Sequence, residues 1–328
     1  MPDPKLEEHY STVIPALFDG RVIPFLGAGA NLCGRPIGTP WQPGRYLPKG
    51  DELADYLARE LGCPAGEEQV SCPQSGTGLC NIPKKSKDLS RVSQYISVTS
   101  GEGPLYEKLH KLFAPEYPST ALHQFLATMP IFFRKNNYPV RYQLIVTTNY
   151  DDILEDSFRD AKEPYDLVSY LAQEDPRGIF LHRSPDGNEH LIRKPNEYIS
   201  VSPDKCTVIL KIHGAVDRSK PERDSYVITE DDYIDYLTQT DISKLVPVRL
   251  AEKMKTSHFL FLGYSLGDWN MRAILHRIWG QQKRSYRSWA VRLNPSWIDE
   301  RSWSRRGVDI LNVHLEDYIT TLRERINM

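Results

Sequence analysis

The stretch "VTTNYDDILE", residues 146–155, joins a short apolar run to a segment with the spacing of a helix. Its first residues continue an apolar run that begins at Leu144, whereas Ile153 and Leu154 lie at helical spacing among carboxylates. Asn149 lies between the two halves, at the predicted corner from strand to helix. In α/β proteins such corners, at the carboxyl ends of strands, face the ligand crevice. The stretch therefore predicts an α/β fold with a polar side chain at a ligand-binding edge.

Several other apolar runs have the length of buried strands and end in turn residues. They are VIPFLGAGAN (22–31), CTVILKIHG (206–214), HFLFLGYSLGDWNMRAILHRIW (258–279, which continues into a helix), SYRSWAVRLN (285–294) and GVDILNV (307–313). Apolar strands without polar alternation, separated by helices, indicate a parallel sheet that is covered on both faces. We therefore predict an α/β fold with a doubly wound, mostly parallel, Rossmann-like sheet. Residues 1–62 and 141–328 are expected to form this core, and residues 63–140 a mainly helical insertion.

Two segments carry more local predictions. Residues 160–205 contain scattered Pro and Gly and are expected to hold only short strands and loops. The segment TEDDYIDYL (229–237) predicts a helix, with Thr229 as its N-cap and Asp232 as an acidic variant of the capping box.

The composition limits the classes of protein and of partner. The net charge of −2 gives no bulk attraction to nucleic acid or membrane, and basic residues near the C-terminal end, in 279–287 and 299–307, are interpreted as a solvated rim. No apolar stretch approaches the ~20 residues of a membrane helix. Five cysteines fit a reducing compartment better than a disulfide framework. We expect a cytoplasmic protein without a membrane segment and without strong direct binding of nucleic acid.

The glycine-rich turn after the first strand allows two interpretations. Gly27 and Gly29 permit backbone amides to approach a phosphate closely, but they also suit an ordinary tight turn. Leu32 stands where the dinucleotide-binding fingerprint has its third glycine, so this is not the loop of an ordinary dehydrogenase.

The other strand ends also combine a structural and a functional interpretation. Asn149 either caps the following helix or holds a ribose hydroxyl or a water, and Asp151 suits a helix N-terminus. His213 is either a satisfied core residue or, at the carboxyl end of a central strand, an acid–base group. Gly263 and Ser265 are candidates for contact with a phosphate or a ribose.

Together the four loops resemble the sirtuin-like NAD-binding domain, with the elements in the same order. Sirtuins have Gln-Asn-Ile-Asp where this chain has Thr148-Asn149-Tyr150-Asp151, and Gly-Thr-Ser where it has Gly263-Tyr264-Ser265. The resemblance spans roughly residues 20–290, although only the short motifs carry it. It implies a sirtuin-type fold.

The chain departs from the protein-deacylating sirtuins. Those usually carry paired CxxC zinc ligands, whereas Cys63, Cys72 and Cys80 are widely spaced and Cys206 lies in a predicted strand, so no metal is expected. LCGRPIGTPW (32–41) also replaces the deacylase Asp-Phe-Arg pattern. This segment, together with the Asn149 and Gly263 turns, looks like the branch found in bacterial anti-phage defence.

That resemblance implies a NAD glycohydrolase, which cleaves its substrate NAD to nicotinamide and ADP-ribose and thereby halts an infected cell (abortive infection). It implies catalytic roles for Asn149, Asp151 and His213. Contacts with NAD are expected from Gly27, Ala28, Gly29, Asn31, Thr148, Gly263 and Ser265. The alternatives are a NAD-dependent protein deacylase, a catalytically silent NAD or ADP-ribose sensor and, last, a dehydrogenase.

The same resemblance carries an expectation about control. The recognisable fold runs to about residue 315, which leaves little length for a sensor domain of typical size, ~100 residues or more. We therefore expect a bacterial, cytoplasmic homo-oligomer controlled by a separate sensor chain, either a nucleic-acid-handling ATPase or a short Argonaute-like protein. The contact surface is expected in the insertion, residues 63–140.

Overall fold

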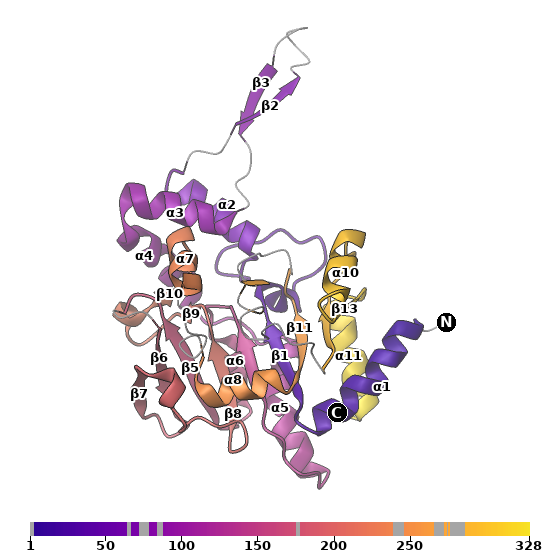
Figure 1. The fold of residues 1–328 in the computed structure, drawn as a ribbon. Helices are drawn as coiled ribbons and strands as arrows, with labels where there is room; N and C mark the ends of the chain where they lie inside the picture. The colour runs from indigo at the N-terminus through magenta and orange to yellow at the C-terminus, as the bar shows by residue number, and fades with distance from the viewer. Residues whose placement is uncertain are drawn as a thin grey trace.

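The computed structural model describes residues 3–63, 67–71, 79–83, 88–174, 178–238, 246–265, 272–273, 275 and 286–328, and for 67–71 and 79–83 it describes the backbone alone. The central sheet is built from β1 (Val22–Leu26), β4 (Leu144–Thr147), β5 (Tyr165–Leu171), β6 (Ile179–Arg183), β7 (Glu189–Ile192), β8 (Thr207–Lys211), β11 (His258–Leu262), β12 (Ser288–Val291) and β13 (Val308–Leu311). Their order across the sheet is β13-β12-β11-β1-β4-β8-β5-β6-β7 (Figure 1).

Seven neighbouring strands, from β13 to β5, run parallel, and only β6 and β7 pair antiparallel at one edge. The strands β1, β4, β8 and β12 are buried along their whole length. Such runs need apolar cover on both faces, which is why they lack polar alternation in the sequence. The predicted mostly parallel α/β sheet is therefore confirmed.

The helices lie on both faces of the sheet and at one end of it. They are α1 (Pro4–Phe18), α2 (Gly50–Glu60), α3 (Leu89–Ser100), α4 (Glu102–Phe113), α5 (Ala121–Lys135), α6 (Ile153–Asp160), α7 (Glu230–Thr238), α8 (Val248–Lys255), α10 (Trp297–Ser304) and α11 (Leu315–Ile326). Short 3₁₀ turns occur at η1 (Ala28–Leu32), η2 (Pro195–Glu197) and η3 (Pro221–Arg223). None of the described helices is both long and apolar enough to cross a membrane.

Alternate side chains of each strand point to opposite faces of the sheet, and two apolar clusters result. On one face, Ile23 and Phe25 of β1 pack in a cluster with residues of α7, α8 and α10. On the other face, Val22 and Leu26 pack with residues of α1, α5, α6 and α11. The sheet is thus covered by helices on both sides, as a doubly wound fold requires.

A third apolar cluster joins α2, α3 and α4 to the region just beyond β4 and contains Tyr150, Ile153 and Tyr226. Helix α5 belongs instead to the cluster on the sheet. The hairpin of β2 (Glu67–Ser71) and β3 (Leu79–Pro83) forms a separate two-stranded sheet. The division into a core and an insertion at 63–140 stays a prediction.

The local predictions had mixed outcomes. The capping box is confirmed, because the Asp232 amide donates to Thr229 Oγ1 at 3.0 Å and the Thr229 amide donates to Asp232 Oδ2 at 2.9 Å. Residues 160–205 are more regular than predicted, since β5 is a full member of the parallel sheet and β6 and β7 extend it. Most of the predicted helix after Ser265 lies outside the described residues.

Candidate functional site

The four predicted loops follow strand ends that are in register with one another across the sheet. Leu262 of β11 pairs with Leu26 of β1, Leu26 pairs with Thr147 of β4, and Thr147 pairs with Lys211 of β8. Each predicted loop follows directly after one of these four residues. Because neighbouring strands lie about 4.8 Å apart, the loops emerge side by side at the carboxyl edge of the sheet. The structure therefore brings the sequence-predicted segments together.

The loops after β1 and β11 are packed against each other through glycine. The Gly29 amide donates to the Gly263 carbonyl at 2.8 Å, and the Gly27 amide donates to the Leu262 carbonyl at 3.1 Å. Gly263 has φ +66°, and a Cβ on it would lie 2.0 Å from the nitrogen of Ala30. These glycines are thus required for the contact between the loops. In this conformation the amides of Gly27 and Gly29 already donate hydrogen bonds to carbonyls of the protein.

Replacing Gly263 by alanine is expected to destabilise the fold by several kcal/mol, because both the positive φ and the backbone contact exclude a Cβ. Gly34 provides the matched control, since its φ is +90° but a Cβ on it would meet nothing within 4 Å. Gly34→Ala is expected to cost no more than about 1–2 kcal/mol. Denaturant titration measures both variants, and equal losses would show that the contact between the loops contributes nothing.

Asn149 is held in the site rather than at the helix. Its amide N–H donates to Thr147 Oγ1 at 3.0 Å, and its side-chain Nδ2 donates to the Gly27 carbonyl at 3.2 Å. Helix α6 begins later, with Asp152 at its N-cap position. The interpretation of Asn149 as a helix cap is therefore wrong, and its carboxamide links the β4 and β1 loops.

A second side-chain pair crosses between the same two loops. Asn31 Nδ2 donates to Asp151 Oδ2 at 2.9 Å, and both residues are buried. Burial raises the pKa of Asp151, while Lys211 and the hydrogen bond from Asn31 act in the opposite direction. Asn31 Oδ1 is buried and has no hydrogen-bond partner among the described residues. The pair therefore leaves one acceptor that a donor on a ligand can satisfy.

His213 lies just beyond β8, in a closed and apolar setting. Its side chain is buried, its ring packs edge-on against Tyr233 at 5.4 Å, and its Nε2 has no hydrogen-bond partner within the described structure. Burial lowers the pKa of His213 to about 3, so the imidazole is neutral at physiological pH. The backbone is fixed on both sides: the His213 carbonyl accepts from the Val227 amide at 2.9 Å, and Gly214 has φ +85°.

Three buried histidines predict a loss of stability in acid. Burial lowers the pKa to about 3 for His9 and His213 and to about 4 for His123. In the unfolded chain these histidines titrate near 6.5. Between pH 6.5 and about 4 they are therefore protonated in the unfolded state but remain unprotonated in the folded state. The free energy of unfolding should therefore fall with falling pH, by about 1.4 kcal/mol per pH unit for each histidine. Asp152, whose pKa burial raises to about 7, opposes part of this fall.

The variant His9→Gln tests this pH dependence. Glutamine does not titrate, and it retains a polar partner for the hydroxyl of Tyr318, which lies 2.8 Å from His9 Nε2. The slope of unfolding free energy between pH 4 and 6 should decrease by about 1.4 kcal/mol per pH unit. His190→Gln, at an exposed position, should leave the slope unchanged. An unchanged slope in His9→Gln would contradict the assignment of acid lability to buried imidazole.

The remaining predicted contacts lie at the same edge. The Thr148 amide donates to the Leu26 carbonyl at 3.2 Å, Ala28 is partly exposed in η1, and Ser265 is exposed at the end of the described β11 turn. Of the four cysteines considered as zinc ligands, Cys63 and Cys206 are described, only the backbone of Cys80 is described, and Cys72 lies outside the described residues. Within the described chain no group of three or more His, Cys, Asp or Glu side chains is arranged to hold a metal ion.

The sequence interpretation missed a buried ion pair directly behind the site. Lys211 Nζ lies 2.7 Å from Glu155 Oε1 and also donates to the carbonyls of Tyr150 and Asp151. The side chains of Lys211 and Glu155 are 1% and 3% exposed. A single lysine inside the apolar run TVILKIHG was the available signal, since buried lysines are rare unless paired. The pair fixes the backbone that carries Asp151.

Comparisons with known proteins agree with this architecture. The family model described as "SIR2-like domain" matches residues 143–311, a range that contains Asn149, Asp151, His213, Gly263 and Ser265 but not the glycine-rich loop after β1. The chain is 28% identical to the NAD(+) hydrolase ThsA of Enterococcus faecium over 224 residues, which are 68% of this chain and 38% of the relative.

Two further relatives are similar to the same degree. Identity to ThsA of Acinetobacter baumannii is 26%, over 70% of this chain and 39% of the relative. Identity to Defense-associated sirtuin 2 of Bacillus subtilis is 24%, over 71% of this chain and 20% of the relative. The matched part is thus about two fifths or less of the length of these relatives. The family model covers just over half of the 328 residues, and the chain therefore belongs to the SIR2-like domain family.

Proposed function

We propose that this chain binds NAD at the carboxyl edge of its sheet and hydrolyses it to nicotinamide and ADP-ribose. The observation that carries the proposal is the buried polar set at that edge. The Asn149–Gly27 and Asn31–Asp151 hydrogen bonds join two loops, and His213 beyond the neighbouring strand presents an unsatisfied ring nitrogen. The similarity to relatives named NAD(+) hydrolase supports this choice of substrate and reaction.

The reaction breaks the bond between the ribose C1′ and the nicotinamide nitrogen. The pyridinium takes up the bonding electrons and leaves as neutral nicotinamide, while positive charge develops on the ribose. Water adds at C1′ and releases one proton. A neutral imidazole can accept that proton, or polarise a ribose hydroxyl, and such a base typically contributes ~10²–10⁴-fold in rate. Burial lowers the pKa of His213 to about 3, so the imidazole is neutral and able to accept a proton. Efficient base catalysis then requires that contact with the substrate raise this pKa toward neutrality.

The two neighbouring side chains have distinct proposed roles. Asn149 orients the ribose and the attacking water with a carboxamide that carries no charge. Asp151, held by Asn31 at 2.9 Å, contacts the nicotinamide carboxamide or supports the cationic sugar. The unpaired Asn31 Oδ1 offers an acceptor beside it. Ala28 and Ser265, together with Gly27, Gly29, Thr148 and Gly263, are proposed to contact the remainder of NAD, its pyrophosphate and adenosine.

The variant Asn149→Ala tests the proposed positioning role. Loss of the carboxamide should reduce nicotinamide release by about 10²-fold or more, because small misplacements of reacting groups have effects of this size. Stability should fall by only about 1 kcal/mol, since one hydrogen bond to Gly27 is lost. Asn196→Ala, at an exposed position in η2, is the control. Activity in Asn149→Ala equal to that of this control would contradict the role of Asn149.

We further propose that the hydrolase acts in anti-phage defence by abortive infection, in the bacterial cytoplasm, and is controlled by assembly. The control would require a homo-oligomer and a separate sensor chain, either a nucleic-acid-handling ATPase or a short Argonaute-like protein. The similarity to Defense-associated sirtuin 2 supports the defence role. The isolated chain should then hydrolyse NAD slowly at low concentration and faster in a larger assembly. Full activity of a monomer would contradict control by assembly.

A further inference from the structure

Arg218 crosses between the two segments that carry the proposed catalytic residues. It lies five residues after His213, and its guanidinium pairs with two carboxylates at the start of α6. One of them belongs to Asp152, which occupies the N-cap position of α6 and directly follows Asp151. The other belongs to Asp156, whose Oδ2 lies 3.1 Å from Arg218 Nη2. Arg218 therefore ties the segment after His213 to the helix that begins at Asp151.

The guanidinium also reaches the connection between α4 and α5. Arg218 Nη2 donates to the Pro115 carbonyl at 3.4 Å, and the Arg218 side chain is 24% exposed. One side chain thus contacts three segments that are far apart in the sequence. Arginine suits such a place because its planar guanidinium presents several donors in a rigid fork, whereas lysine has a compact ammonium on a flexible stem.

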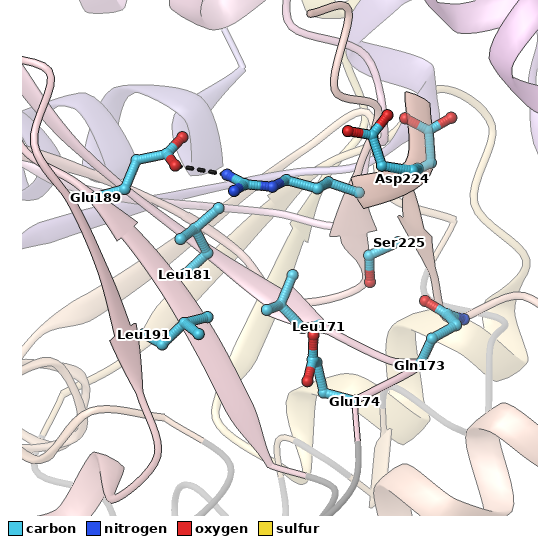
Figure 2. Close-up of a pocket in the computed structure, with 10 residues that line it drawn as sticks. Leu171, Gln173, Glu174, Leu181, Glu189, Leu191, Asp224 and Ser225 are labelled. Atoms are coloured by element: carbon cyan, nitrogen blue, oxygen red, sulfur yellow. Dashed lines mark hydrogen bonds and ion pairs between the residues drawn. The ribbon is translucent and has the colours of Figure 1, made fainter. Parts of the chain in front are cut away.

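The segment that carries Arg218 is held on its far side by other contacts. Ala215 pairs with Ser225 in an antiparallel two-stranded sheet, and the Asp217 amide donates to Asp224 Oδ1 at 2.7 Å. Asp224 and Ser225 also line a cavity of about 370 Å³ at the β7 edge of the sheet (Figure 2). These contacts fix residues 214–217 toward β7, which is the side away from the Asn149 turn.

On the near side, the segment meets the turn that contains Asn149. The Val216 amide donates to the Tyr150 carbonyl at 3.0 Å, and Arg218 adds its two ion pairs. The separation between His213 and the Asn149 turn is therefore set by contacts between loops and not by one continuous helix or strand.

The two carboxylates favour a cation at this place. The side chains of Asp152 and Asp156 are 15% and 21% exposed. Burial raises the pKa of Asp152 to about 7, and repulsion from Glu155 adds to this rise. The positive charges of Lys211 and Arg218 act in the opposite direction. Arg218 therefore favours the ionised form of Asp152, to which it is itself bound.

We infer that Arg218 is a positioning residue, which holds His213 and the turn from Asn149 to Asp151 at the separation that cleavage of NAD requires. This inference rests on the proposed function, because it concerns the same site. The groups proposed to act on NAD come from the ends of two different strands. A displacement of about 1 Å between such groups can lower the rate ~10²-fold.

A direct contact between Arg218 and NAD is the competing role. Arg218 Nε is buried and has no hydrogen-bond partner in the described part of the chain, and arginine commonly binds phosphate. The two roles differ in their kinetics. Loss of a contact with NAD that is made equally in the ground state raises KM, whereas displacement of the reacting groups lowers kcat.

Arg159 provides a matched control, because it contacts the same two carboxylates from within α6. Its Nη2 pairs with Asp156 and lies 3.8 Å from Asp152 Oδ2. Arg159→Gln and Arg218→Gln therefore remove the same charge beside the same acids. Only Arg218→Gln also releases the segment after His213 from α6.

Arg218→Gln is expected to lower kcat for nicotinamide release by about 10²-fold and to leave KM within about threefold of the wild type. Arg218→Lys should recover part of the rate, because lysine can hold one carboxylate but does not bridge two as a guanidinium does. Arg159→Gln should stay within about threefold of the wild type in both constants. The inference is overturned if Arg218→Gln and Arg159→Gln have equal kcat, or if Arg218→Gln raises KM and leaves kcat unchanged.

A second variant covers the case in which Arg218→Gln folds poorly. Arg218→Gln/Asp152→Asn also removes one of the carboxylates that would remain without this partner, so it should unfold closer to the wild type. Its kcat should be as low as that of Arg218→Gln. A well-folded double variant with the kcat of Arg159→Gln would overturn the positioning role.

Amide hydrogen exchange tests the contact without NAD. Exchange at residues 214–218 should be faster in Arg218→Gln than in the wild type, because local opening becomes easier, and it should be unchanged in Arg159→Gln. If the wild-type chain does not cleave NAD, the proposed function fails, and exchange still decides whether Arg218 holds the two segments together. Unchanged exchange in Arg218→Gln overturns that contact, and faster exchange with a wild-type kcat overturns the positioning role.

Discussion

Replacing His213 by alanine is expected to lower the rate of nicotinamide release from NAD by about 10²–10⁴-fold, the usual contribution of a positioned general base. The imidazole is buried, neutral and free at Nε2 within the described structure, so alanine removes the proton acceptor without leaving a buried charge. His213→Gln should be similarly slow, because glutamine retains polarity but cannot take up the proton.

A structural role for His213 makes different predictions. Its ring packs against Tyr233, so some loss of stability is expected, and NAD binding by each variant must be measured beside the rate. His190→Ala, at an exposed position of β7, is the matched control and should hydrolyse NAD at the wild-type rate. Wild-type turnover in His213→Ala would exclude a catalytic role. A slow variant with intact NAD binding and an intact fold would support the role.

Replacing Lys211 by methionine is expected to reduce the free energy of unfolding by about 3–5 kcal/mol. The reason is not the strength of the ion pair but the charge that is left behind, because Glu155 would remain buried without its partner. Lys211 Nζ lies 2.7 Å from Glu155 Oε1 and also binds two backbone carbonyls beyond β4. The same substitution should therefore also displace Asp151 and reduce NAD hydrolysis.

The double variant Lys211→Met/Glu155→Leu separates these effects. Removing both charges should recover most of the lost stability, since apolar replacements of a buried pair are often neutral. The exposed pair of Lys194 and Glu197, at 3.2 Å, supplies the control, and Lys194→Met should cost at most about 1 kcal/mol. Thermal or denaturant unfolding measures all three variants. A loss in Lys211→Met no larger than in Lys194→Met would contradict the assignment of a buried charge.

The fold could be predicted because most of its central strands are predominantly apolar and are interrupted only by single polar residues such as Lys211 and Asp309. That pattern arises only where both faces of a sheet are covered, so it identified β1, β4, β8, β11, β12 and β13 without any knowledge of tertiary contacts. Strand β5 was expected only as a short strand in an irregular segment, and not as a member of the parallel sheet, because Asp166 and Ser169 interrupt its apolar run and the surrounding segment is rich in Pro and Gly. Both polar residues are nevertheless buried in the structure. There, Asp166 Oδ1 lies 2.7 Å from His182 Nε2.

The site could be predicted only in part. Residues at the ends of neighbouring parallel strands must emerge together, and this placed Gly27, Asn149, His213 and Gly263 at one edge. The sequence does not show which hydrogen-bond partners the side chains have. The Asn149–Gly27 hydrogen bond and the close packing at Gly263 could therefore be seen only in the structure. The roles proposed for these residues in binding and cleaving NAD stay predictions.

The most direct test of the central claim is chromatographic analysis of NAD after incubation with the purified chain. A high protein concentration favours assembly, and the His213→Ala chain provides the background. The proposal predicts that the wild-type chain consumes NAD and releases nicotinamide and ADP-ribose in equal amounts, without an added metal or acyl peptide. NAD that stays intact at every protein concentration, to the same extent with the wild-type and His213→Ala chains, would contradict it.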